Sequence, residues 1–539
     1  MEGPSTDTLT QAEISGGKAT QTTKLVSGTT ITTIISSDAL GNLTVRQSVD
    51  AARPGVESFA LGLPALETDE AIHIPTGSGL RLDQEFAGQR EFEWPRDWRV
   101  QKAFLETAKG AVLVEADDPQ FQYFKSLNVQ SDSTSDTLHI SLSTQVPQPV
   151  VEKKQGESAL WAIRSIEGSW QAQAAAESDR ILASRPADIR RAQQQRTWVR
   201  DIRLVVTPFR MRQSASGPLN EQRYRDLLLN LSKRVDPAST LINFAYDWRN
   251  EELDTGMPGQ EVNKFGKRTV EYARSLGFKV MLSIDFRCDL RHALYPQVRL
   301  AHMRYGLPQS PPYGYRASTL GAEYKSFVQR PLWKVRAHIA ETQLAAINPA
   351  LKSWREFFLR QMSRVLRVYK VHAVHVTGIS YVNDANGLIE GMNSIQGYRE
   401  LLKEVRSAVP AITVLSVDAW DETTLAYADM AQLQLPDQLE VNPERPADML
   451  FDDQWLDDLS PVSAELLRRD FPPYSPITIS PSFPRSCAAW DASTACIGPI
   501  PHAAGIDDQM LQSAPPSLQA RLQEYSALKE LGEVTLSWN

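Results

Sequence analysis

The sequence predicts a multidomain protein in which an N-terminal antiparallel β-sandwich is followed by a (β/α)8 barrel. With 539 residues the chain is too long for one hydrophobic core. Many short apolar strands lie between turn signals in the first part, which is typical of stacked antiparallel sheets. Later, strands alternate with amphipathic helices, which is typical of a parallel sheet. The expected organisation is a disordered lead-in (1–20), a β-sandwich (21–155), a helical linker (156–199) and a barrel (200–539).

Composition excludes several classes of function. The hydrophobic content of 42% and charged content of 23% are those of an ordinary soluble globular protein. A net charge of −8 argues against nucleic acid as a partner, because phosphate binding needs a basic face. No apolar run reaches the roughly 20 residues of a membrane span. The first residues lack the features of a signal peptide, so we expect a cytoplasmic protein, or a secreted or periplasmic one whose signal peptide was removed. The oligomeric state is not indicated.

Metal and cofactor chemistry is not expected. Three cysteines exclude a disulfide framework and a cysteine-rich zinc module. Cys487 and Cys496 lie in one loop-like segment, where they either pair or remain free thiols. His372 and His375 are three residues apart on an expected strand, so they point to opposite faces and cannot bind one metal together. The sequence contains neither a Gly-rich phosphate loop nor a Gly-x-Ser-x-Gly elbow.

The first part of the chain shows strand and turn signals. Thr29–Ile35 and Leu43–Gln47 flank a turn at Asp38–Asn42, which predicts a hairpin. Ala111–Glu115 and Leu138–Leu142 predict further strands.

Two further features complete this part. The aromatic and charged cluster Phe92–Trp98 is expected to cap the sandwich or to pack against the next domain. Ala159–Ala176 and Pro186–Gln195 are rich in Ala, Gln, Glu and Arg, which favours helices in the linker.

The second part predicts eight strands and five helices in alternation. The expected strands are Ile202–Thr207, Leu241–Tyr246, Lys279–Ile284, Ala373–Thr377, Ile412–Val417, Ala431–Leu435, Pro476–Ser480 and Glu533–Ser537. The expected helices are Asn220–Val235, Val262–Leu276, Trp354–Tyr369, Ile395–Val409 and Pro516–Leu531. A long insertion at Leu290–Pro349 has the length of a functional lid or binding wall.

Several segments carry a resemblance to a known family; they are Phe92–Pro95, Gly277–Leu282, Ile347–Pro349, Trp354 with Arg355, and Val371–Glu400. With the order of sandwich, linker and barrel, the chain resembles the retaining glycoside hydrolases related to the α-galactosidases. More closely, it is similar to a bacterial group of glycosidase-like proteins with this layout. The resemblance implies a carbohydrate substrate or ligand and hydrolysis of an O-glycosidic bond.

One residue departs from the family pattern. In the relatives the fourth strand typically ends in an aspartate, which is the expected nucleophile or a substrate carboxylate, whereas this chain has Thr377 there. A hydroxyl group can neither form the glycosyl ester nor supply the negative charge that stabilises an oxocarbenium ion. On the fifth strand, Asp418 keeps a carboxylate. Either the catalytic pair has moved, or the activity is lost.

Glycoside hydrolysis needs two carboxyl groups beside the scissile bond, and barrel enzymes bind ligands at the carboxyl ends of their strands. We therefore predict Asp418 and Asp285 as the catalytic pair; the alternative is that they cap elements or pair with Arg residues. Rings and guanidinium groups beside them suit a sugar. The predicted substrate-binding residues are Asp247, Trp248, Arg249, Arg287, Asp289, Thr377, Tyr381, Asp384, Trp420 and Glu422.

Three hypotheses follow. The first is a glycosidase that acts through strand-end carboxylates on an oligo- or polysaccharide, without metal or cofactor. The second is a non-catalytic carbohydrate-binding protein on the same scaffold, in which Thr377 marks the lost nucleophile. The third is a barrel enzyme of another class, such as a lyase or isomerase, which would need a Lys, His or Tyr base.

Overall fold

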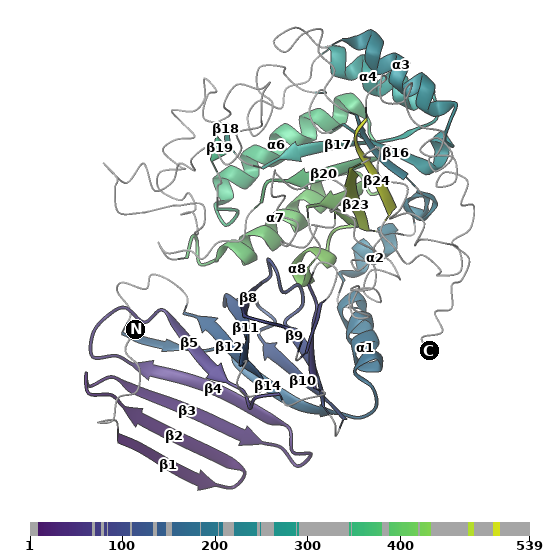
Figure 1. Cartoon of the computed structure of the whole chain (residues 1–539). Coiled ribbons are helices and arrows are strands. Elements are labelled where there is room, and N and C mark those ends of the chain that lie inside the picture. The colour runs from purple at the N-terminus through teal and green to yellow at the C-terminus, as the bar shows by residue number, and fades with distance from the viewer. Residues whose placement is uncertain are drawn as a thin grey trace. The chain divides into compact units, whose positions relative to one another are not determined.

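The computed structural model of the chain (Figure 1) describes most of its first 430 residues and two later strands. The described residues are 9–66, 70–76, 80–83, 85–107, 110–132, 137–146, 154–183, 185–193, 195–202, 204–208, 220–244, 248, 264–286, 288–289, 344–345, 348–379, 388–418, 421–432, 473–478 and 500–506. Among them, no helix has the length and apolar character that crossing a membrane requires.

The chain divides into two compact units. The first contains Met1–Ala183, Asn383–Gly397 and Asp458–Leu466, and the second contains Ser184–Val382, Tyr398–Asp457 and Leu467–Asn539.

The first unit contains two antiparallel sheets, as expected for a β-sandwich. The larger sheet has the order β1-β2-β3-β4-β14-β10-β9-β6-β7, with β13 beside β4, and the smaller has the order β5-β12-β11-β8. The strands are β1 Leu9–Ser15, β2 Lys18–Lys24, β3 Thr30–Ser37, β4 Leu43–Asp50, β5 Ser58–Gly62, β6 Ala71–Ile74, β7 Leu80–Leu82, β8 Gln89–Trp94, β9 Lys102–Thr107, β10 Gly110–Asp117, β11 Lys125–Asp132, β12 Thr137–Gln145, β13 Gln155–Glu157 and β14 Leu160–Ile166. Helix α1 (Trp170–Ala183) follows β14.

The predicted hairpin is confirmed. Strands β3 and β4 pair antiparallel along their whole length. Between them the carboxylate of Asp38 accepts hydrogen bonds from the backbone N–H groups of Leu40 and Asn42, both at 2.9 Å. The aspartate therefore stabilises the turn by the local bonding typical of such residues.

Two predictions for this unit are wrong. Residues 9–20, expected as a disordered lead-in, belong largely to the β1–β2 hairpin. Its turn residues Gly16 and Gly17 have φ values of +57° and +76°, a conformation that glycine adopts without strain and that suits two-residue hairpins. Residues 160–166, expected as the start of a helical linker, form β14 between β10 and β4. Pairing on both edges there outweighs the helical composition.

The cluster at residues 92–98 packs inside the first unit. Phe92, Trp94 and Trp98 are all 1% exposed or less. Trp98 stacks on Trp161 of β14 and donates its indole N–H to the carbonyl of Lys102 at 2.7 Å. The packing role predicted for these rings is confirmed.

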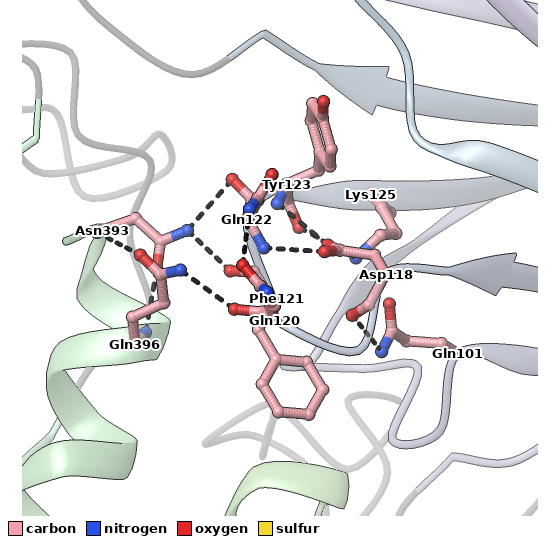
Figure 2. Close-up of polar contacts among 9 residues, drawn as sticks. All are labelled: Gln101, Asp118, Gln120, Phe121, Gln122, Tyr123, Lys125, Asn393 and Gln396. Atoms are coloured by element: carbon pink, nitrogen blue, oxygen red, sulfur yellow. Dashed lines mark hydrogen bonds and ion pairs between the residues drawn. The ribbon is translucent and has the colours of Figure 1, made fainter. Parts of the chain in front are cut away.

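A turn between β10 and β11 is held by a buried charge (Figure 2). The carboxylate of Asp118 accepts from the backbone N–H groups of Gln122 and Tyr123, both at 3.0 Å. It also pairs with the ammonium group of Lys125 at 2.7 Å, and that group lies 4.1 Å from the ring centre of Trp94. The buried cation is thus balanced by an anion and an aromatic face.

The carbonyl groups of this turn face the start of helix α7 (Ser394–Ala408), as Figure 2 shows. Within the first unit, Asn393 donates its amide N–H groups to the carbonyls of Phe121 (2.8 Å) and Gln122 (3.1 Å). Gln396 donates to the carbonyl of Gln120 at 2.9 Å. Asn393 and Gln396 also bond each other's backbone N–H, the reciprocal pattern of a capping box. One cap therefore fixes the beginning of the helix and the turn together.

The second unit is built on eight parallel strands that pair in a closed ring, β15-β16-β17-β20-β21-β22-β23-β24. They are β15 Leu204–Pro208, β16 Thr240–Phe244, β17 Lys279–Asp285, β20 Ala373–Thr377, β21 Val414–Val417, β22 Met430–Gln432, β23 Pro473–Thr478 and β24 Ile500–Ile506. The other α-helices in the described residues are α2 Ala187–Gln193, α3 Glu221–Ser232, α4 Lys264–Ser275, α6 Lys352–Tyr369 and α8 Glu422–Leu425, and the 3-10 helices there are η2 Thr197–Asp201 and η3 Pro237–Ser239. A short pair, β18 (Cys288–Asp289) and β19 (Leu344–Ala345), lies in the insertion.

Seven of the eight predicted strands overlap the strands of the ring. The eighth is wrong in position, because β24 closes the ring by pairing with β23 and β15. Residues 533–537 lie outside the described residues, as does the predicted helix at 516–531. Strand β24 contains Pro501 and Gly505, which are uncommon in strands, so its sequence gives no strand signal.

The inward face of the ring is apolar at its amino-terminal end. Met281 of β17, Ala373 of β20 and Val414 of β21 form one buried cluster with residues of three other strands. Val199 and Ile202, which precede β15, complete this cluster. Because side chains alternate along a strand, residues two and four positions later on β17, β20 and β21 also face inward.

Gly266 of α4 lies against the backbone of Trp248. A Cβ atom at Gly266 would be 2.3 Å from the carbonyl oxygen of Trp248 and 2.5 Å from its Cα atom. Since backbone atoms cannot rotate aside, we expect Gly266→Ala to destabilise the barrel unit by about 1–3 kcal/mol, despite the better helix propensity of alanine.

Chemical denaturation measures this effect. The control is Lys267→Ala. Lys267 is the next residue in the same helix, but its side chain is exposed, so the change should alter the free energy of unfolding by less than about 0.5 kcal/mol. A Gly266→Ala protein as stable as the parent would contradict the close approach of α4 to Trp248.

Candidate active site at the carboxyl ends of the barrel strands

Three candidate residues lie in one row at the carboxyl ends of adjacent strands. Asp285 of β17 is in register with Thr377 of β20. Val376 of β20 is in register with Val417 of β21, so the next residues, Thr377 and Asp418, are level. Because neighbouring strands are about 4.8 Å apart, the Cα atoms of Asp285 and Asp418 are roughly 10 Å apart. The two carboxylates therefore stand on either side of Thr377.

The carboxylate of Asp418 accepts three hydrogen bonds. Oδ2 accepts from the hydroxyl of Thr377 at 2.9 Å and from the backbone N–H of Gly378 at 2.8 Å. Gly378 has a φ of +78°, a conformation that favours glycine. Oδ1 lies 3.1 Å from Nε2 of His375. The side chain is 31% exposed.

These bonds keep Asp418 ionised. Burial acts to raise the pKa of its carboxyl group. The hydrogen bond and charge of His375 act in the opposite direction, as do the hydrogen bonds from Thr377 and Gly378. Together they outweigh burial, so the pKa lies below its usual value. At neutral pH the group is therefore an anion. An anionic carboxylate suits a nucleophile, a general base or a stabiliser of positive charge, and does not suit a proton donor.

A polar layer lies directly below this row, two residues earlier on each strand. Nδ1 of His375 is 3.0 Å from the hydroxyl of Ser416. The hydroxyl of Ser283 donates to the amide oxygen of Asn243 at 2.9 Å. All four side chains are buried, with residue exposures of 6% or less. From its amino-terminal end upward, the inward face thus changes from apolar side chains to hydrogen-bonded polar ones, and then to the carboxylates.

Asp421 and Tyr398 are two further groups near Asp418. Asp421 is fully buried and caps α8 through the backbone N–H groups of Thr423 (2.7 Å) and Thr424 (3.0 Å). Burial, together with the charges of Asp421 and Asp418, raises the pKa of Tyr398 well above its usual value. The phenol therefore keeps its proton at neutral pH.

Asp285 is also buried, with 3% of its surface exposed. The backbone around it is fixed by its neighbours. The N–H of Phe286 donates to the carbonyl of Thr377 at 2.9 Å, and the indole of Trp354 donates to the carbonyl of Phe286 at 2.9 Å.

The other predicted substrate-binding residues differ in position. Trp248 is fully buried and donates its indole N–H to the carbonyl of Ser283 at 3.2 Å, so it packs the barrel wall. Glu422 begins α8 and is partly exposed. The backbone of Asp289 lies in β18. The structure describes no side chain for Asp289, and the following lie outside the described residues: Asp247, Arg249, Arg287, Tyr381, Asp384 and Trp420.

Of the partners of Asp418, the sequence singled out Thr377 as a functional residue but not His375 or Gly378. Both ring nitrogens of His375 have hydrogen-bond partners, as is typical of a buried histidine. Its link to Asp418 depends on the register of β20 and β21, which the sequence does not state. Ser416, two residues before Asp418, could have been found from alternation along the strand. Within the described parts of the chain, no group of three or more potential metal ligands occurs.

His372 lies at the other end of β20 and accepts a hydrogen bond from the backbone N–H of Val280 through Nδ1 at 3.1 Å. Burial, with smaller effects of Lys279 and Arg274, lowers its pKa to about 4. In the unfolded chain a histidine has a pKa near 6.5. Between these values the unfolded chain binds a proton that the folded protein does not.

Stability should therefore be complete above about pH 6.5 and fall as the pH is lowered toward 4, by at most about 1.4 kcal/mol per pH unit. Urea denaturation of the parent and His372→Asn at pH 7 and pH 5 tests this, because an Asn oxygen still accepts the bond from Val280 without titrating. The parent should lose more stability than the variant. An equal loss in both proteins would exclude His372 as the source.

No protein-family model and no curated protein matches the sequence. Solved structures with a similar fold do exist. The α-N-acetylgalactosaminidase NagBb from Bifidobacterium bifidum, solved with GalNAc, has a TM-score of 0.63 and 9% identity, covering 97% of this chain and 84% of that chain. The GH36 α-galactosidase AgaA from Geobacillus stearothermophilus has a TM-score of 0.52 and 10% identity, covering 95% and 69%. AgaB from the same organism has a TM-score of 0.52 and 10% identity, covering 95% and 68%.

At these identities the similarity establishes the fold. It extends over nearly the whole chain, so it includes both the β-rich unit and the barrel unit. The resemblance to glycoside hydrolases related to the α-galactosidases is thus confirmed in fold: the chain has a distant glycoside-hydrolase-like architecture.

Proposed function

We propose that this protein is a glycoside hydrolase that cleaves O-glycosidic bonds in an oligo- or polysaccharide, with Asp418 and Asp285 as the working carboxylates. The observation that carries the proposal is the state of Asp418. It is an ionised, partly exposed carboxylate, oriented by three hydrogen bonds, at the carboxyl end of a barrel strand. In barrel enzymes, catalytic residues come from this end of the strands.

The two carboxylates would divide the work by their environments. Asp418, whose pKa is lowered, would act on the sugar as an anion, either as nucleophile or by activating water. Asp285, which lies at the end of β17 on the other side of Thr377, would protonate the leaving-group oxygen. This chemistry needs carboxylates and water and no cofactor. The same proposal includes a complete (β/α)8 barrel with all its helices. It also includes sugar binding by the remaining predicted substrate-binding residues.

Thr377 favours a second candidate function, a carbohydrate-binding protein without catalysis. Its hydroxyl lies at the strand end where the resemblance implies a catalytic aspartate, and it donates to Asp418. If Asp418 serves only to anchor a sugar hydroxyl group, the scaffold binds a glycan and leaves it intact.

One screen separates the two functions. The purified protein is incubated with α- and β-linked nitrophenyl glycosides, and with oligosaccharides whose cleavage is followed by reducing ends; binding of the same oligosaccharides is measured by calorimetry. Turnover identifies a glycosidase, whereas binding without turnover identifies the binding protein. Absence of both across the panel would contradict both proposals.

A further inference from the structure

The two oxygens of Asp418 are held by different kinds of donor. Oδ2 is held by the end of β20 itself, through the Thr377 hydroxyl and the Gly378 backbone. Oδ1 has one described donor, the imidazole of His375. His375 therefore completes the orientation of the carboxylate by holding the oxygen that the end of β20 does not hold. Each carboxylate oxygen has two lone pairs, and among the described residues His375 occupies one of the two on Oδ1.

Ser416 fixes the imidazole in turn. Because Asp418 is ionised it can only accept, so Nε2 of His375 carries the proton of that bond, and Nδ1 is hydrogen-bonded to the Ser416 hydroxyl. Ser416 is fully buried on β21, two residues before Asp418. One strand thus supplies both the carboxylate and the group that orients the histidine bound to it.

Packing alone does not require a histidine at this position. The layer below is apolar, with Ala373 on the same strand as His375. Burying a polar ring is unfavourable unless its hydrogen bonds are satisfied. Here they are satisfied by Ser416 on one side and Asp418 on the other. The ring therefore connects the interior of the barrel to the candidate catalytic carboxylate.

We propose that His375 is a positioning residue for Asp418: held by Ser416, it donates through Nε2 to Oδ1 and fixes the orientation and ionisation of that carboxylate. The inference rests on the proposed function insofar as Asp418 acts on a sugar. The orientation of Asp418 by His375 does not depend on the proposed function. Among the described residues, Tyr398 interacts with the charges of Asp418 and Asp421, Asp421 caps α8, and Asp285 lies on the other side of Thr377.

Two variants of His375 test the inference. In His375→Gln the side-chain amide can still donate to Asp418 and accept from Ser416. His375→Leu has a similar volume and can do neither. The titration of the Asp418 carboxyl is followed in each protein by ¹³C NMR, with Asp418→Asn to assign the signal, and thermal melting shows that each variant is folded.

In His375→Leu we expect the Asp418 titration to move up by about one pH unit or more, because a hydrogen bond to a charged group is lost. On the best substrate of the parent, kcat should fall about tenfold to a hundredfold with little change in KM. The acid limb of the pH profile should move with the titration. His375→Gln should recover most of each effect, which a merely structural role would not produce.

The outcomes are separable. An unchanged Asp418 titration in a folded His375→Leu protein would overturn the inference, whether or not the parent turns over a glycoside. A raised titration with no recovery in His375→Gln would also overturn it, since orientation by a donor would not be the cause. A parent without turnover contradicts the proposed function alone, because the NMR titration still decides the role of His375.

Discussion

Asp429→Ala should destabilise the barrel unit by about 3–5 kcal/mol, which is enough to unfold many domains. Asp429 lies between two buried guanidinium groups: Oδ1 pairs with Arg196 at 2.7 Å, and Oδ2 pairs with Arg406 at 2.7 Å. All three side chains are at most 7% exposed. Burial lowers the pKa of Arg406, and the charge of Asp429 opposes this. Without the carboxylate, two buried cations would face each other unbalanced.

The carboxylate also holds the backbone, since Oδ2 accepts from the N–H of Leu415 at 2.9 Å at the start of β21. Asp429→Asn keeps the volume of the side chain but removes its charge. We expect it to cause most of the loss of stability that Asp429→Ala causes. Exposed Asp201 is the control position, and its replacement by alanine should matter by less than about 0.5 kcal/mol. If Asp429→Asn melts like the parent, the charge does not stabilise the unit.

Much of the fold can be predicted from the sequence where local and tertiary preferences agree. Lys279–Ile284 is an apolar run that follows a helix ended by Gly277, and it forms β17 as predicted. The local turn chemistry of Asp38 likewise fixes the β3–β4 hairpin. In both cases the residues that signal the element also make its hydrogen bonds.

Prediction fails where tertiary pairing decides. Residues 160–166 have helix-compatible residues, yet neighbours on both edges make them a strand. Strand β24 has little strand propensity, and it is a strand because it closes the ring between β23 and β15. These neighbours are distant in sequence, so no local pattern records them.

The candidate site likewise contains residues that the sequence predicts and contacts that it does not predict. Asp285, Thr377 and Asp418 are found from the rule that ligands bind at the ends of barrel strands, and the register brings the three into one row. The dependence of Asp418 on His375 and Gly378 cannot be predicted, because it requires the offset between β20 and β21. Trp248 was predicted at the site from its position after a strand, but its side chain turns into the wall.

Asp418→Asn should reduce kcat/KM by about 10²- to 10⁴-fold, the range for a lost catalytic acid or base. Asparagine has the same shape but no charge. Its amide NH2 would face one of the donors that now surround the carboxylate, His375 on one oxygen or Thr377 and Gly378 on the other. Asp285→Asn should lower turnover too, and most strongly for glycosides with poor leaving groups, which depend on protonation.

The measurement that tests the account most directly is therefore kcat/KM for the best nitrophenyl glycoside in the parent, Asp418→Asn and Glu356→Gln. Glu356 is an exposed carboxylate on α6 and controls for the loss of a charge alone. We expect near-complete loss of activity in folded Asp418→Asn and parental activity in Glu356→Gln. Hydrolysis by Asp418→Asn at the parental rate would contradict it, because the sugar would then react without the carboxylate at the end of β21.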